Sequence, residues 1–224
     1  MKISLNKLAE YNRCPKAGRR TKIIRDAKYP SSQNYAPYYG LIRIPVLNYI
    51  VSGDAAHLTN AINEIDARVS TDPDEFFYKD NKASKAAISS IKKIELPDFT
   101  RGGNYLKINT KKSNLTKEGV KITALPEILI YNKEGAVIGG IKMHYTKKPK
   151  IVDESMKDIG HLLHQVIAQD HAADPEKIRR SKCYCIDVST QRILATPKAF
   201  VSREKDISQA CADIATLWPS VARS

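Results

Sequence analysis

A change in hydrophobic periodicity near residue 100 constrains the fold of this chain most strongly. Before Pro97 the apolar residues recur at helical spacing, whereas after it they alternate with polar residues, as in β-strands. The alternating segments are residues 105–109, 120–125 and 128–131. Asn132–Gly135 has the composition of a hairpin turn and leads into a strand at 136–145. The sequence therefore predicts three strands in series, the third at 136–145 and the second ending at Ala124–Glu127.

A helix and two further strands follow. Residues 153–171 place apolar side chains at helical spacing, residues 183–188 read as a strand, and residues 192–195 read as its hairpin partner. Ser202 is expected to cap a last helix that extends through Leu217. A strand, a helix and a second strand in this order are typical of a right-handed crossover, so we predict an α/β sheet flanked by helices.

The first hundred residues are predicted to be mainly helical. Ser4 can cap a helix that ends near Cys14-Pro15, and a second helix is expected at 17–27. Further helices are expected at 38–51, interrupted at Pro45, then from Asp54 onward and at 83–94. The length of 224 residues suits one domain: residues 1–27 form the first helices, 28–100 a helical insertion, and 101–224 the mixed-sheet core.

The charge of the chain points to a polyanionic partner. The sequence has 37 Lys and Arg residues against 24 Asp and Glu residues, a formal net charge of +13. Nine of the basic residues fall within residues 1–28. Lysine and arginine gain free energy by displacing counterions from a phosphate backbone. We therefore expect nucleic acid as the partner, although an acidic protein partner or solubility alone would also account for the charge.

Composition excludes several other classes of protein. Hydrophobic residues make up 42% of the chain, which excludes a disordered or collagen-like chain. No apolar run approaches the roughly 18–20 residues that cross a bilayer, and residues 1–10 lack the apolar stretch of a signal peptide. We expect a cytoplasmic protein with no membrane partner. Cys183 and Cys185 lie two apart in a strand, so burial of reduced thiols is favoured over zinc binding.

Two charged residues can meet across the predicted hairpin. Glu127 precedes the turn and Lys142 lies in the strand that follows it, so the two side chains can face each other. The carboxylate could hold a divalent cation, and the ammonium could orient a water or stabilise negative charge on a phosphate. The alternative is a cross-strand surface salt bridge.

The chain resembles the PD-(D/E)XK nuclease superfamily, and within it the RecB-like branch that includes CRISPR-adaptation exonucleases. Ser4, Leu8, Tyr11 and Cys14-Pro15 are similar to the first-helix pattern of that branch, and Pro126-Glu127 followed by Lys142 is similar to its strand motifs. The resemblance implies a restriction-endonuclease-like αβββαβ core. It also implies a metal-dependent nuclease that hydrolyses phosphodiester bonds of DNA, in repair, recombination, or a phage or defence context.

The resemblance also implies roles for individual residues. Glu127 would be the metal-binding acid and Lys142 the motif lysine, with Mg²⁺ or Mn²⁺ as the cofactor. Gln165 would correspond to the glutamine of the branch that positions substrate or metal, and Glu10 would supply a further acid. Gln165 and Glu10 could equally be residues of a solvated helix surface.

One position departs from the superfamily pattern. The second acid, two residues before the lysine, is replaced by Gly140. A single carboxylate holds Mg²⁺ weakly. Three explanations are open: an acid from elsewhere (Glu10, Asp153 or Glu154) replaces it, the strand register differs, or the protein is a catalytically degenerate nucleic-acid-binding subunit of a larger complex.

Cysteine and histidine patterns give weaker indications. Some relatives in the branch bind an iron–sulfur cluster through a first-helix cysteine and three C-terminal ones, but the spacing of Cys183, Cys185 and Cys211 argues against a cluster. His161 and His164 lie three apart on one helix, where a surface or site-lining position is favoured over metal binding.

The residues expected to contact nucleic acid come mainly from the first two predicted helices. His144 and two lysines after the third strand add to them. A protein partner or a second copy of the chain is left open by the sequence. The expected nucleic-acid contacts are Lys7, Arg13, Lys16, Arg19, Arg20, Lys22, His144, Lys147 and Lys148.

Overall fold

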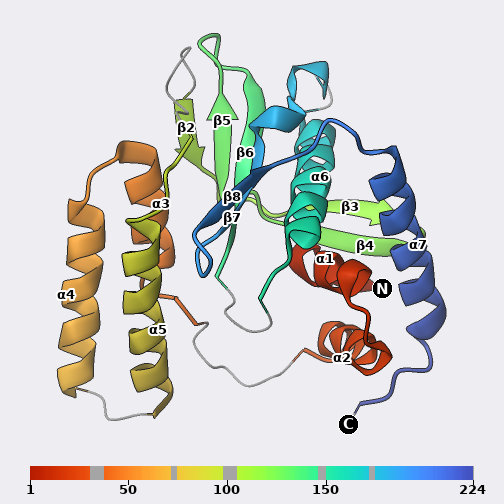
Figure 1. The fold of residues 1–224 in the computed structure, drawn as a ribbon, viewed down its shortest axis with the longest axis horizontal. Coiled ribbons are helices and arrows are strands. Elements are labelled where there is room, and N and C mark those ends of the chain that lie inside the picture. Colours follow the sequence, from red (N-terminus) through yellow and green to blue (C-terminus); the bar gives the residue numbers. More distant parts are fainter. Residues whose placement is uncertain (31–37, 72–74, 98–104, 146–149, 172–174, 224) are drawn as a thin grey trace.

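The chain has a mixed α/β fold in the computed structural model, as the sequence predicted (Figure 1). The structure describes residues 1–30, 38–71, 75–97, 105–145, 150–171 and 175–223. Its described strands form two sheets, one with five strands and one with three. No helix in these ranges combines the length and apolar composition needed to cross a bilayer.

The five-stranded sheet contains the expected crossover. Its strand order is β2-β5-β6-β7-β8, and β5 runs antiparallel to both β2 and β6. The helix α6 (Asp153–Asp170) connects β6 to β7, which pair in parallel. The turn at Asn132–Gly135 joins β5 to β6. Two hydrogen bonds close it: Ala136 N–H donates to Asn132 Oδ1, and Asn132 N–H donates to the Ala136 carbonyl oxygen. The strands are β2 (Tyr105–Ile108), β5 (Ile128–Tyr131), β6 (Val137–His144), β7 (Cys183–Asp187) and β8 (Arg192–Ala195).

The prediction of three strands in one series was wrong, because the strands are divided between the five-stranded sheet and a separate three-stranded sheet. The segment at 120–125 forms β4 (Val120–Ala124), which pairs with β1 (Lys2–Ser4) and β3 (Ser113–Lys117) rather than with β5. Glu127 therefore lies between the sheets, directly before β5. The prediction missed this division because alternation shows which face of a strand is buried but not which strand pairs with it.

The first two helices agree closely with the sequence. Ser4 Oγ accepts a hydrogen bond from Lys7 N–H and caps α1 (Leu5–Arg13), which ends before Cys14-Pro15. The next helix is α2 (Ala17–Lys28). The expected cap of the last helix was wrong, because α7 (Val201–Leu217) begins after Phe200 and Ser202 lies inside its first turn.

The segment predicted to be a helical insertion, residues 28–100, contains α3 (Arg43–Ser52), α4 (Ala56–Thr71) and α5 (Glu75–Ile91). The expected break at Pro45 was wrong. Pro45 is the third residue of α3, where a backbone N–H has no partner within the helix, so proline is tolerated. The predicted helix at 83–94 begins earlier, at Glu75.

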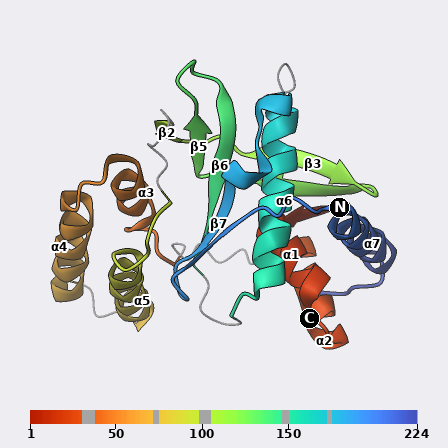
Figure 2. The same cartoon turned by 45° about the horizontal axis from the view of Figure 1, so that its top comes forward.

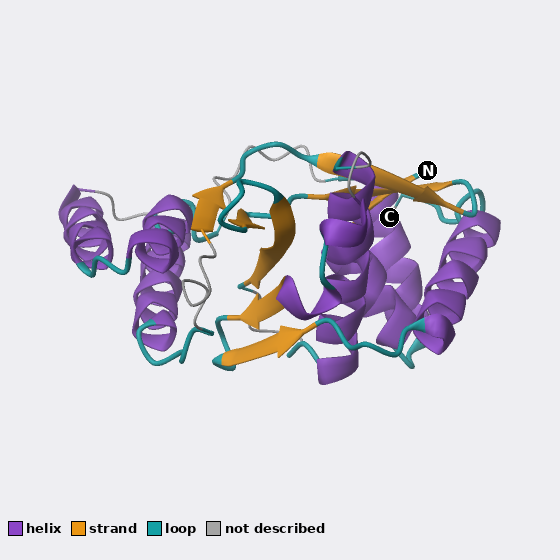
Figure 3. Ribbon diagram, turned by 90° about the horizontal axis from the view of Figure 1, so that it is seen from above, coloured by secondary structure: helices purple, strands orange, loops and turns teal. Residues whose placement is uncertain are grey.

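The five-stranded sheet separates two hydrophobic cores. In Figures 1 and 2 the insertion helices lie on one side of the sheet, and α1, α2 and α7 lie on the other with α6 across the strands. Figure 3 shows the strands between these two groups of helices. One core joins the insertion to residues such as Ile128 and Met143, and the other joins α1, α6 and α7 around Leu8 and Ile159. Two short 3₁₀ helices, Pro175–Lys177 and Arg180–Lys182, precede β7.

Candidate nucleic-acid interface

Glu127 and Lys142 pair across β5 and β6, as the hairpin register predicted. Lys142 Nζ lies 2.5 Å from Glu127 Oε1, and Met143 N–H donates to Glu127 Oε2 at 3.0 Å. Their side chains are 16% and 11% exposed, for Glu127 and Lys142 respectively. This ion pair is therefore more enclosed than the surface salt bridge that was the alternative.

Gly140 has no room for the acid that the resemblance would place there. A Cβ atom on Gly140 would lie 2.7 Å from Ile167 Cδ1 and 2.9 Å from the carbonyl oxygen of Ile128. Both distances are below normal van der Waals contact, and the second involves backbone. The close packing of α6 against β6 therefore requires glycine at this position.

The three acids considered as replacements each have a basic partner elsewhere. Glu10 accepts from Arg19 Nε at 2.7 Å, Asp153 pairs with Arg192, and Glu154 pairs with Lys157 and Arg203. Hydrogen bonds from Lys157 and Arg203 lower the pKa of Glu154 to about 2.

The donors around Glu127 fit a resident divalent cation poorly. Glu127 offers one carboxylate, whose oxygens already accept two hydrogen bonds, and the Gly140 position is closed. Within the ranges that the structure describes, no three His, Cys, Asp or Glu side chains gather closely enough to bind a metal. Mg²⁺ and Mn²⁺ prefer several oxygen ligands, so a cation here would depend on oxygens brought by a ligand.

Gln165 lies in a different cluster from the Glu127–Lys142 pair. Its Nε2 donates to Glu204 Oε2 at 2.8 Å, and His161 Nε2 lies 2.7 Å from the same oxygen. Lys117 also pairs with Glu204. His161 is fully buried, so of the two expected positions, at the surface or lining a site, the surface position is wrong for this residue. Sequence reasoning missed Glu204, because nothing in the pattern of α7 shows which of its residues faces α6.

The Glu204 cluster predicts loss of stability in acid. Burial lowers the pKa of His161, and Arg180 Nη1 donates to His161 Nδ1 at 2.9 Å, which leaves Nε2–H to donate to Glu204. Burial would raise the pKa of Glu204, but hydrogen bonds from Lys117, His161 and Gln165 outweigh it and lower this pKa to about 2. Both groups have a lower pKa when folded, so the unfolded chain binds more protons.

We expect the thermal midpoint of unfolding to fall as the pH is lowered from about 6.5. The first part of the fall comes from protonation of His161 in the unfolded chain, and the second part, below about 4.5, from protonation of Glu204. Thermal unfolding of the wild type and of His161→Gln between pH 7.5 and 4 measures this. The variant is expected to lose part of the dependence above pH 5 and to keep the rest, because burial also lowers the pKa of His164. His57→Gln, on α4, is expected to keep all of it. Identical profiles for the wild type and His161→Gln would contradict the assignment.

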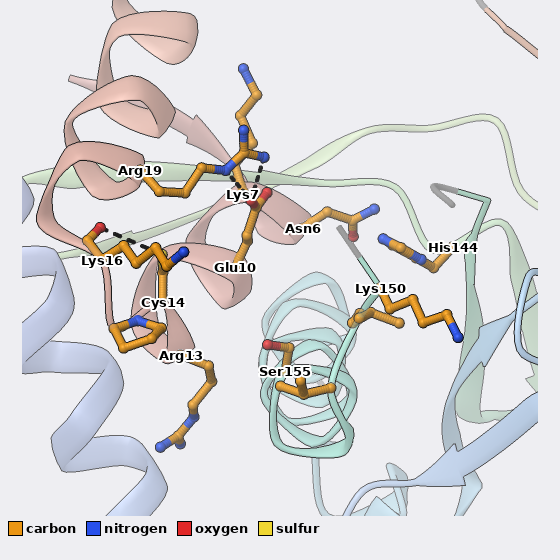
Figure 4. A pocket seen from close by; sticks show the side chains of 13 residues that line it. Asn6, Lys7, Glu10, Arg13, Cys14, Lys16, Arg19, His144, Lys150 and Ser155 are labelled. Carbon is orange, nitrogen blue, oxygen red and sulfur yellow. Dashed lines mark hydrogen bonds and ion pairs between the residues drawn. The ribbon is translucent and has the colours of Figure 1, made fainter. Parts of the chain in front are cut away.

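A basic cavity of about 630 Å³ lies between α1, the start of α2 and the chain that leads into α6 (Figure 4). Figure 4 shows Asn6 and His144 facing each other on one wall and the Glu10–Arg19 pair on another. Burial lowers the pKa of Lys7. Among the described residues that line it, Glu10 is the only acidic one. The basic residues on its wall are Lys7, Arg13, Lys16, Arg19, His144 and Lys150.

Several residues expected to contact nucleic acid have partners within the protein instead. Arg13 reaches Asp158 and Asp206, so its charge is used inside the protein. Arg20 donates to the Cys14 carbonyl and lies over the Tyr11 ring, and Lys22 is exposed on α2. His144 Nδ1 lies 3.2 Å from the buried carboxylate of Asp187. Lys147 and Lys148 lie outside the described residues.

A second cavity of about 470 Å³ adjoins the Glu127–Lys142 pair. Residues before and within α3 form one wall, and residues around β2, β5 and β6 form the other. Asn6 lines both this cavity and the basic one. The first turn of α1 therefore borders both cavities.

The comparisons with family models and with curated proteins give no independent assignment of family or function. No family model matches the chain, and a search of curated proteins finds no significant match.

Proposed function

We propose that this chain is a nucleic-acid-binding protein of the PD-(D/E)XK-like fold, and that the phosphate backbone of DNA occupies the basic cavity. The observation that carries the proposal is the cavity itself, which Lys7, Lys16, Arg19 and Lys150 line from separate segments and which shares Asn6 with the cavity beside the Glu127–Lys142 pair. Arginine and lysine in a concave surface favour a polyanion over a neutral ligand.

The order of elements supports the proposed fold. After α1, the strands β2, β5 and β6 form an antiparallel series, α6 crosses over, and β7 pairs in parallel with β6. This order is consistent with the αβββαβ core that the resemblance implies, with the β3–β4 hairpin lying between β2 and β5 in the sequence. Pro126-Glu127 directly precede β5, and Lys142 lies in the neighbouring strand β6, which fits the motif positions that the resemblance implies.

Removal of three cavity lysines is expected to weaken DNA binding. The variant Lys7→Ala/Lys16→Ala/Lys150→Ala takes away three cations that line the cavity. At low salt each phosphate contact contributes mainly through counterion release, so we expect at least a tenfold loss of affinity. Fluorescence anisotropy with a labelled single-stranded oligonucleotide measures it.

The matched control is Lys82→Ala/Lys92→Ala/Lys93→Ala, which removes the same charge from exposed positions on α5 and just after it. We expect this control to bind nearly as tightly as the wild type. Equal losses in both triple variants would mean that net charge alone drives binding. Tight binding to an acidic polypeptide with none to DNA would instead indicate a protein-docking scaffold.

Metal-dependent cleavage of DNA is a second candidate, favoured by the contact between Glu127 and Lys142, the two residues that the resemblance identifies with the superfamily motif. Labelled linear and circular DNA, incubated with Mg²⁺ or Mn²⁺, tests it. Cleavage that disappears in both Glu127→Gln and Lys142→Met would support an active nuclease. Binding without cleavage would support a degenerate member that leaves cutting to a partner.

A further inference from the structure

The cavity beside the Glu127–Lys142 pair has aromatic walls. Tyr38, Tyr39 and Tyr145 line it, together with Arg43 from α3. The rings of Tyr39 and Tyr145 lie 5.2 Å apart between centroids at an interplanar angle of 30°, and the Arg43 guanidinium lies 5.9 Å from the Tyr145 centroid. Aromatic and guanidinium planes of this kind stack on nucleobases.

The backbone holds Tyr39 in this position against a steric penalty. Its φ of 65° is in the left-handed region, which a tyrosine rarely adopts. Asp80, which is 2% exposed and paired with Arg68, accepts a hydrogen bond from Tyr39 N–H at 2.6 Å. The Tyr39 carbonyl accepts from Ile42 N–H and Arg43 N–H at the start of α3. The Tyr39 backbone is therefore anchored before any ligand binds, as in preorganised binding sites.

Two residues that line the cavity each have a buried polar atom without a partner. Tyr145 Oη and Asn6 Oδ1 are both shielded from solvent, and neither forms a hydrogen bond within the described residues. Burial, and then the charge of Glu127, raises the pKa of Tyr145, so its hydroxyl keeps the proton and can donate. Asn6 Oδ1 can only accept. Buried polar atoms without partners are uncommon and costly, so these two side chains would gain a hydrogen bond by turning toward a ligand, one as donor and one as acceptor.

We propose that this cavity receives one unpaired nucleobase of the strand whose phosphates lie in the basic cavity. The cavity volume of about 470 Å³ is within the range of small-molecule sites. Asn6 borders both cavities, so a sugar–phosphate backbone in the basic cavity has a base-sized recess beside it. A base enters only when it is unstacked and unpaired, and the protein is therefore expected to prefer single-stranded over duplex DNA. This inference rests on the proposed function.

The test compares two single strands with the same phosphates, one of thymidines and one of abasic residues. Stacking of one base predicts that the wild type binds the thymidine strand about fivefold or more tightly than the abasic strand. Tyr145→Phe keeps the ring and removes only the hydroxyl. It is expected to weaken binding of the thymidine strand by about threefold to tenfold and to leave binding of the abasic strand unchanged. The control, Tyr131→Phe on β5, alters a tyrosine outside the cavity and is expected to match the wild type.

The outcomes separate this inference from the proposed function. Salt-sensitive binding of both strands with equal affinity would overturn the base site and leave the proposed function standing. Binding of neither strand would overturn the proposed function, and the base site with it. A preference for the thymidine strand that Tyr145→Phe does not reduce would also overturn the assignment of this cavity.

Discussion

Replacement of Asp158 by alanine is expected to lower the free energy of unfolding by about 3–5 kcal/mol. Asp158 lies on α6 and is fully buried. Its Oδ2 accepts from Arg13 Nε at 2.8 Å and from Asn12 Nδ2 at 2.8 Å, and its Oδ1 pairs with Arg203. The Asp158 carboxylate on α6 thus contacts residues of both α1 and α7. Alanine would leave the partly enclosed guanidinium groups of Arg13 and Arg203 without the Asp158 carboxylate.

Denaturant unfolding at neutral pH measures the effect. The matched control is Asp66→Ala, because Asp66 pairs with Lys85 on exposed surfaces of α4 and α5. An exposed pair contributes about 0–1 kcal/mol, so the control is expected to unfold near the wild type. A change below about 1 kcal/mol for Asp158→Ala would show that the three helices are held together by other contacts.

Restoration of the motif acid by Gly140→Asp is expected to destabilise the protein rather than to create a nuclease. The new side chain would meet Ile167 Cδ1 and the Ile128 carbonyl within 3 Å of its Cβ. Overpacking of a core costs about 1–3 kcal/mol, and an enclosed carboxylate adds to that cost. We expect a loss of at least about 3 kcal/mol and no gain of DNA cleavage with Mn²⁺.

Gly18→Asp on α2 is the matched control, since a Cβ at Gly18 meets nothing within 4 Å. Its position in the first turn of a helix also suits an acid. This control is expected to be as stable as the wild type. A Gly140→Asp protein that is equally stable and cleaves DNA would show that packing does not exclude the acid.

Local sequence signals predicted the elements that depend on near neighbours. Ser4 and Cys14-Pro15 delimit α1, and the apolar spacing of 153–171 gives α6 to within one residue. The turn at Asn132–Gly135 sets the register that brings Glu127 to Lys142. In each case the deciding interaction lies within about 15 positions along the chain, so the pattern contains it.

Features that depend on packing between distant segments were not predictable in this way. The strand β3 has the sequence Ser-Asn-Leu-Thr-Lys. Its mainly polar composition gives no sign of a strand, although it pairs with β4. Gln165 meets Glu204 from another helix, and Arg13 meets Asp158 at a separation of 145 positions. The charge of Arg13 was visible in the sequence, but its use inside the protein was not.

The central claim is that phosphates bind in the basic cavity, and the salt dependence of DNA affinity tests it most directly. The measurement compares the slope of log K against log salt concentration for the wild type and for Lys7→Ala/Lys16→Ala/Lys150→Ala on one single-stranded oligonucleotide. Loss of three phosphate contacts predicts a slope shallower by about two for the variant. Parallel slopes for the two proteins would contradict the claim and place the DNA elsewhere on the surface.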